Sequence, residues 1–152
     1  MRFVLTILLL LGALVAPSCS SPLAEDERGE WTERVLEAAP PRRDILSAFE
    51  VAVLNAGFPE GERDESRGTV TSGYDLQMQP FRNKGRRWQG ILKVERNDEG
   101  ETVLMSRVMM DRNTTQDDTL DPGEAEWSAM ADDMRRSRIL LQHALVLLHL
   151  EN

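Results

Sequence analysis

The chain has 152 residues, which corresponds to one domain at about 150 residues per domain. A hydrophobic content of 41% can fill a core and excludes a wholly disordered chain. The net charge of -8 argues against a nucleic-acid binder that works through a general basic field. A single cysteine excludes an internal disulfide and a cysteine-cluster metal site. We therefore expect no nucleic acid, metal or cofactor among its ligands.

The amino-terminal segment is apolar. Met1 and Arg2 precede an apolar run from Phe3 to Ala16, in which Thr6 is the one polar residue, and small and polar residues follow it. One positive charge, an apolar segment and a small-residue cleavage zone are typical of a secretory signal peptide. As a helix, the run spans only about 21 Å, which is shorter than a bilayer core of roughly 30 Å. We therefore assign residues 1–18 to a cleaved signal peptide.

The cysteine, Cys19, follows this segment directly, in the sequence Ala16-Pro17-Ser18-Cys19. The sequence resembles a bacterial lipobox, although Ala16 replaces the usual leucine and Pro17 is uncommon. The resemblance implies that the Cys19 thiol receives diacylglycerol and becomes the mature amino terminus. The alternative is ordinary signal-peptidase cleavage that leaves Cys19 as a free thiol, which is a liability in an oxidising compartment.

Lipidation of Cys19 implies a bacterial cell-envelope protein that binds the membrane through its acyl chains. Ser20 after the cysteine, in place of aspartate, resembles the signal for sorting to the outer membrane, facing the periplasm. Loss of residues 1–18 leaves 17 basic and 26 acidic side chains, a net charge of -9. Anionic lipids repel such a surface. Residues 19–30 are polar and acidic, as in a flexible tether.

Residues 31–152 are predicted to form a single domain that starts with helical patterns. Trp31 and Val35 are spaced as on one side of a short helix over Trp31–Ala38. Pro40 and Pro41 then interrupt the chain. A second helix over Arg42–Ala56 is predicted from apolar residues at helical spacing, and Gly57 is suited to end it.

Three segments are predicted as strands because apolar and polar residues alternate in them. They are Gly68–Leu76, Arg86–Arg96 and Thr102–Arg112. The last two flank the turn Asn97–Gly100 and are expected to form an antiparallel hairpin. In the final strand, Leu104, Ser106, Val108 and Met110 are expected to face away from Val103, Met105 and Met109.

A long final helix is predicted from Asp121, as its cap, to about Leu150. Pro122 suits the first helical position and Glu124 suits a capping box. From Ile139 onward this helix is apolar almost all round. The predicted fold is thus a two-layer α+β domain, in which a three-stranded antiparallel sheet packs against an N-terminal helix and a long C-terminal helix.

The segment from Phe49 to Arg112 carries a family resemblance. A helix ending in Gly57-Phe58, an acidic turn, Gly68-Thr69-Val70-Thr71 and a hairpin with an arginine-rich start follow one another. This order resembles the small helix-grip-like domains of envelope lipoproteins, such as those of the BamC family of outer-membrane assembly factors. The resemblance implies a protein-interaction or scaffolding role at the envelope. No catalytic residues are carried over from it.

The titratable residues are not spaced as in a known catalytic or metal-binding motif. His143 and His149 are six residues apart, about 120° around a helix, whereas helical metal pairs share one face at four residues. No G-x-S-x-G motif precedes a helix. Asp111, Asn113, Thr115 and Asp117 alternate like calcium ligands, but the central glycine is missing. We therefore expect a protein that is not an enzyme.

Two segments are candidates for binding a partner, expected to be another envelope protein. The first is the apolar end of the final helix, because a small sheet cannot cover a helix that is apolar all round. Its candidate residues are Ile139, Leu140, Val146, Leu147 and Leu150. The second is the basic cluster of Arg82, Lys84, Arg86 and Arg87, followed by Trp88. These charges could equally protect an edge strand from aggregation.

Two alternatives stay open at this stage. The sheet and helices could enclose a small hydrophobic or lipid-like ligand in the periplasm, which would require a closed apolar cavity. An enzyme would require titratable groups that converge in a cleft, supplied by His143, His149 and the acidic loops.

Overall fold

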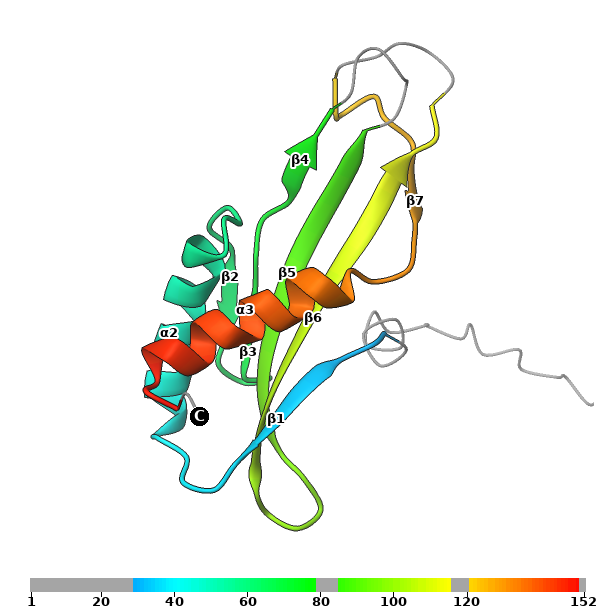
Figure 1. Ribbon diagram of the computed structural model, residues 1–152. Helices are drawn as coiled ribbons and strands as arrows, with labels where there is room; N and C mark the ends of the chain where they lie inside the picture. Colours follow the sequence, from blue (N-terminus) through cyan, green and yellow to red (C-terminus); the bar gives the residue numbers. More distant parts are fainter. Residues whose placement is uncertain (1–28, 79–84, 116–120, 151–152) are drawn as a thin grey trace, which may run out of the picture.

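A computed structural model describes residues 29–78, 85–115 and 121–150 (Figure 1). The predicted signal peptide and Cys19 lie outside these residues. The elements in chain order are β1 (Thr32–Leu36), α2 (Arg42–Asn55), β2 (Glu62–Asp64), β3 (Thr69–Thr71), β4 (Asp75–Gln77), β5 (Arg86–Arg96), β6 (Thr102–Asn113), β7 (Trp127–Ala129) and α3 (Met134–Leu147).

The antiparallel hairpin of β5 and β6 forms the centre of the sheet. Its register pairs Arg86 with Arg112 at one end and Arg96 with Thr102 at the other, which confirms the predicted hairpin. Gly100 occupies the turn with φ +82°, a conformation that glycine adopts without strain. The faces of β6 are also as predicted, since Leu104 and Val108 lie in the core beneath the helices.

The remaining strands lie along both edges of this hairpin. β3 and β4 pair with successive parts of β5, and β1 and β7 pair with successive parts of β6. β2 pairs with the outer edge of β3. The described part of the chain thus forms one seven-stranded antiparallel sheet in the order β1-β6-β5-β3-β2, with β4 and β7 beside the central hairpin. The predicted three-stranded sheet is wrong.

Both helices lie against the same face of the sheet, and they pack on each other (Figure 1). The helix over 42–56 is confirmed as α2, which Gly57 follows with φ +85°. Phe49, Leu92, Leu104 and Leu140 are fully buried between the layers. The end of the sheet that carries β4 and β7 extends beyond α3 (Figure 1).

The predicted helix over Trp31–Ala38 is wrong, because Thr32–Leu36 is the edge strand β1. The alternating pattern of this segment is short, and its side chains contribute little to the core, since Leu36 is the one buried residue of the strand. Backbone pairing with β6, which is remote in sequence, therefore decides its structure.

The predicted strand Gly68–Leu76 is divided into β3 and β4 at Ser72. The Ser72 N–H donates to the Gly90 carbonyl at 2.8 Å, and the Ser72 hydroxyl accepts the Gly90 N–H at 2.8 Å. The side chain thus takes the place of the backbone carbonyl in the ladder, and the two strands pair separately with β5.

The predicted long C-terminal helix is also wrong, since α3 is short and begins at Met134. Asp121 forms a turn, in which its side chain accepts the Gly123 N–H at 2.8 Å. The chain then pairs with β6 as β7 before Asp133 caps α3 by accepting the Arg136 N–H at 3.0 Å. Within α3, the buried Ser137 hydroxyl accepts the Val108 N–H at 2.9 Å and joins the helix to the sheet.

Candidate functional site

The predicted basic cluster is divided between the two faces of the sheet. Successive side chains of a strand point to opposite faces. Arg86 and Trp88 therefore share the face that carries the helices, whereas Arg87 lies on the other face. Arg86 is exposed, Arg87 is half-buried and Trp88 is buried. Arg82 and Lys84 lie outside the described residues.

On the face opposite the helices, Arg87 is enclosed by two aromatic rings. Its guanidinium lies 4.2 Å from the ring centre of Tyr74 and 4.7 Å from that of Trp127. Its Nε also donates to Asp111 at 2.7 Å across the hairpin. Arg87 of β5 therefore contacts β6 through Asp111, β7 through Trp127 and the chain just before β4 through Tyr74. Its side chain has a structural role.

We expect Arg87→Gln to destabilise the domain by about 2 kcal/mol, since it removes a charge-assisted hydrogen bond and two cation–π contacts. The matched change Arg86→Gln is expected to leave the free energy of unfolding unchanged or slightly raised, because it removes a like-charge neighbour. Urea unfolding followed by circular dichroism measures both. Equal losses in the two variants would contradict the structural role of Arg87.

On the helix-bearing face, Arg86 lies directly opposite Arg112 of β6. Both side chains are exposed, and neither forms an ion pair or a hydrogen bond to another side chain within the described residues. Gln77 of β4 and Ser128 of β7 continue the same row across the sheet. Like charges directly opposite each other destabilise a sheet by roughly 0.2–1 kcal/mol. In the part of the chain that the structure describes, this row therefore carries two like charges that no carboxylate neutralises.

The next row of the same face holds one carboxylate, Asp75, beside apolar and aromatic side chains. Trp88 lies opposite Met110, and the Met130 N–H donates to the Met110 carbonyl at 2.8 Å. Arg136 of α3 lies over the Trp88 ring at 4.3 Å and forms an ion pair with Asp75 at 2.7 Å. The buried Trp88 Nε1 has no hydrogen-bond partner among residues 29–78, 85–115 and 121–150.

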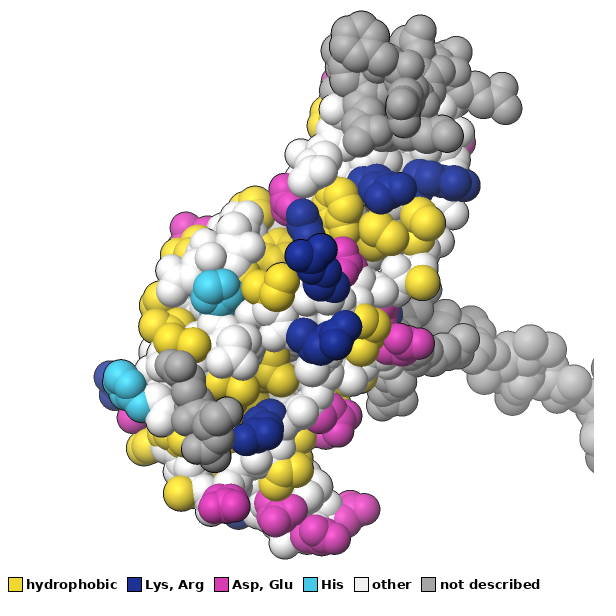
Figure 2. All heavy atoms as spheres, viewed as in Figure 1, with side chains coloured by type: hydrophobic (Ala, Val, Ile, Leu, Met, Phe, Trp, Pro, Cys, Tyr) yellow, Lys and Arg dark blue, Asp and Glu magenta, His cyan; other side chains and the backbone are white. Residues whose placement is uncertain are grey.

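We call these two rows the Arg86–Arg112 surface. It consists of Asp75, Gln77, Arg86, Trp88, Met110, Arg112, Ser128 and Met130, and the carboxylate of Asp75 is paired with Arg136 of α3. Figure 2 shows basic side chains next to hydrophobic ones on this projecting end of the molecule, and acidic side chains gathered at its opposite end. The surface combines exposed cations with an apolar floor, which is the composition that arginine- and tryptophan-centred interfaces use.

Sequence reasoning identified Arg86 and Trp88 of this surface but missed Arg112. The predicted hairpin contained the information needed to find Arg112. Once the turn over Asn97–Gly100 is fixed, the register places Arg112 opposite Arg86. The alternation of β5 likewise assigns Arg87 to the other face.

The second predicted surface, at the end of α3, is partly covered by the fold itself. Leu140 is fully buried, and Leu147 and Leu150 are half-buried against the core. Ile139 and Val146 stay exposed at 45% and 39%. These two side chains form a narrow stripe, so the Arg86–Arg112 surface is the larger candidate.

The two histidines are apart in space as in sequence. His143 lies within α3, and His149 lies in the turn after it with φ +55°. Within the described residues, no group of three or more His, Cys, Asp and Glu side chains could hold a metal ion. No helix in the same part of the chain is long and apolar enough to span a bilayer.

The chain matches no protein-family model. Comparison with curated proteins likewise gives no significant relative. The resemblance to the BamC family therefore stays a prediction, and the function is inferred from the residues themselves.

Proposed function

We propose that this chain is a lipid-anchored, non-catalytic interaction module of the bacterial cell envelope. Acyl chains on Cys19 hold it at the membrane, and the Arg86–Arg112 surface binds an acidic segment of an envelope protein. The observation that carries the proposal is the pair of exposed arginines, which lie opposite each other with no carboxylate partner in the described residues.

The energetics of this pair favour an acidic ligand. A carboxylate placed between two guanidinium groups relieves their repulsion and accepts charge-assisted hydrogen bonds, which are stronger than neutral ones. Arginine presents these donors in a planar fork that matches a carboxylate. Because the mature chain has a net charge of -9, attraction for an acidic partner is confined to this local surface.

The neighbouring groups support a peptide rather than a single ion as the ligand. Gln77 and Ser128 carry hydrogen-bonding side chains on either side of the arginines. Met130 is 39% exposed beside Met110 and supplies flexible apolar contact area. An acidic segment that also carries apolar side chains would bury both parts of the surface.

The anchor places this surface close to the membrane. Two or more acyl chains suffice for stable anchoring. Residues 20–30 extend over at most about 40 Å, so the domain samples a thin layer at the bilayer. Localisation at the outer membrane, facing the periplasm, is part of the proposal and is supported by Ser20 after the cysteine.

Crosslinking in intact cells tests the docking surface. A photoreactive residue at Ser128, beside Arg112, is expected to capture one specific protein, whereas the same residue at Glu99, in the distant β5–β6 turn, is not. Arg86→Glu together with Arg112→Glu is expected to abolish the capture with the fold intact by circular dichroism. Capture that survives the double charge reversal would refute the proposed surface.

A further inference from the structure

A second basic site lies at the other end of the central hairpin. A surface hollow of about 710 Å³ is formed where the start of α2, the turn between β2 and β3 and the end of β5 meet. Its lining residues are Ala39, Pro40, Pro41, Arg42, Ile45, Ser66, Arg67, Val94, Glu95, Arg96 and Thr102. The volume is within the range of small-molecule sites, about 300–1,000 Å³.

Three arginines from three separate elements line this hollow, namely Arg42, Arg67 and Arg96. Arg42 donates to the Ser66 carbonyl at 3.2 Å, and Arg67 lies 3.7 Å from the exposed carboxylate of Asp64. Arg96 has no ion pair within the described residues. The single acidic residue of the lining, Glu95, is neutralised by Lys93 at 2.6 Å. The hollow is therefore positively charged in an acidic protein.

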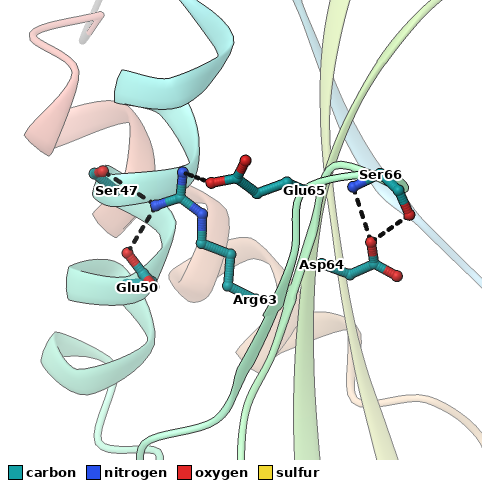
Figure 3. A network of polar contacts seen from close by, with 6 residues as sticks. All are labelled: Ser47, Glu50, Arg63, Asp64, Glu65 and Ser66. Atoms are coloured by element: carbon teal, nitrogen blue, oxygen red, sulfur yellow. Dashed lines mark hydrogen bonds and ion pairs between the residues drawn. The ribbon is translucent and has the colours of Figure 1, made fainter.

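The turn that carries Arg67 is held in place by Asp64. One oxygen of its carboxylate accepts the Ser66 N–H at 2.9 Å and the Ser66 hydroxyl at 2.6 Å (Figure 3). The same oxygen accepts the Arg67 N–H at 3.1 Å. The Ser66 hydroxyl and the Arg67 N–H hold the pKa of Asp64 below its ordinary value. The carboxylate therefore stays ionised, and the turn stays closed, down to a lower pH than for a free aspartate.

An ion pair and a glycine position keep the walls of the hollow close together. Arg63 of β2 forms an ion pair with Glu50 of α2 at 3.2 Å, which connects the β2–β3 hairpin to this helix (Figure 3). Gly68 has φ +74°, and a Cβ atom there would lie 2.5 Å from the Arg42 Nη2 and 2.7 Å from the Val94 carbonyl oxygen. The helix, the turn and β5 thus approach each other as closely as a glycine allows.

The hollow also has an apolar side. Pro40, Pro41, Ile45 and Val94 contribute to its lining, and Ile45 and Val94 are buried at 1% and 5% exposure. Pro41 is the N-cap residue of α2 and supplies no side-chain hydrogen bond to it. A ligand that carries both an anionic head and an apolar body can therefore contact arginines and hydrocarbon at once.

We propose that this hollow, the Arg42–Arg67–Arg96 pocket, binds a small amphiphile with a phosphate or carboxylate head. The oxyanion accepts hydrogen bonds from the guanidinium groups, and the apolar body lies on the two prolines. The site differs from the closed apolar cavity considered from the sequence, since it is open and cationic. It is independent of the proposed docking surface, because the two lie at opposite ends of β5.

The test uses the mature chain with Cys19→Ser, titrated by calorimetry with four probes below their micellar concentrations. Decyl phosphate and decanoate are expected to bind at least tenfold more tightly than decanol and inorganic phosphate. The tighter of the two anionic probes identifies the head group. Equal binding of decanol would show adsorption to apolar surface and would overturn the proposal, as would the absence of binding by both anionic probes.

Substitutions of the lining arginines test whether the probe binds in this pocket. Arg42→Gln together with Arg96→Gln is expected to weaken the binding of the preferred probe at least tenfold. Arg96→Glu provides a second variant that removes no hydrogen bond or ion pair of the described structure, so the fold is retained. Arg135→Gln with Arg138→Gln, two exposed positions of α3, removes the same charge elsewhere and is expected to leave binding unchanged. Unchanged affinity in Arg96→Glu would place the ligand elsewhere.

Discussion

Replacement of Cys19 by alanine is expected to transfer the protein from the membrane fraction to the soluble periplasmic fraction. Each buried CH₂ group of an acyl chain contributes about 0.8 kcal/mol to membrane binding, so in the proposed anchor two chains supply nearly all of the attachment. The mature chain, with its net charge of -9, is expected to be repelled by anionic lipids and to offer no substitute. Cell fractionation, together with labelling by a palmitate analogue, measures the loss of both attachment and label.

The neighbouring change Ser21→Ala serves as the control for Cys19→Ala. It lies in the predicted tether and leaves the proposed acceptor thiol in place, so membrane attachment and label are expected to persist. Mass spectrometry of the mature amino terminus decides the chemistry directly. A soluble wild-type protein with an unmodified Cys19 thiol would contradict the proposed anchor.

The parts of the fold that the sequence predicted correctly are those with local causes. The β5–β6 hairpin follows from two alternating segments that flank the turn over Asn97–Gly100, and this turn brings them together. α2 follows from apolar residues at helical spacing between Pro41 and Gly57. Both patterns are long enough for one periodicity to dominate.

The parts that were predicted wrongly depend on pairing between distant residues. Trp31–Ala38 is too short for its pattern to separate a helix from a strand, and the free edge of β6 decides in favour of β1. Asp121-Pro122-Gly123 is typical of a turn as well as of a helix start. The pairing of Trp127–Ala129 with β6 excludes the helix there, and α3 begins only after Asp133.

The candidate docking surface, too, was predicted only where neighbouring residues in the sequence determine it. Arg86 and Trp88 were visible as neighbours in sequence, but their separation from Arg87 depends on strand alternation. Arg112 enters the surface only through the hairpin register. The Arg42–Arg67–Arg96 pocket could not be predicted, because its three arginines come from a helix, a turn and a strand that tertiary packing brings together.

The junction between the tether and the domain is built on a buried ion pair. Arg107 of β6 and Asp132, which precedes α3, lie 2.7 Å apart with side-chain exposures of 11% and 8%. Asp132 also accepts the backbone N–H of Glu30, at the end of the predicted tether, at 3.0 Å. A Cβ atom on Gly29 would lie 1.9 Å from the Arg107 guanidinium carbon, so the chain crosses directly over the arginine. One carboxylate thus fixes the entry of the chain, β6 and the start of α3.

Asp132→Leu is therefore expected to destabilise the domain by about 3–5 kcal/mol, because it removes the carboxylate that lies 2.7 Å from the buried guanidinium of Arg107. The double variant Arg107→Met with Asp132→Leu removes both charges and is expected to recover at least about 1 kcal/mol of that loss, since well-packed apolar residues can replace a buried pair. Urea unfolding followed by tryptophan fluorescence measures the free energy of unfolding of each variant. If Asp132→Leu unfolded at the same urea concentration as the wild type, the ion pair would have no part in holding the junction together.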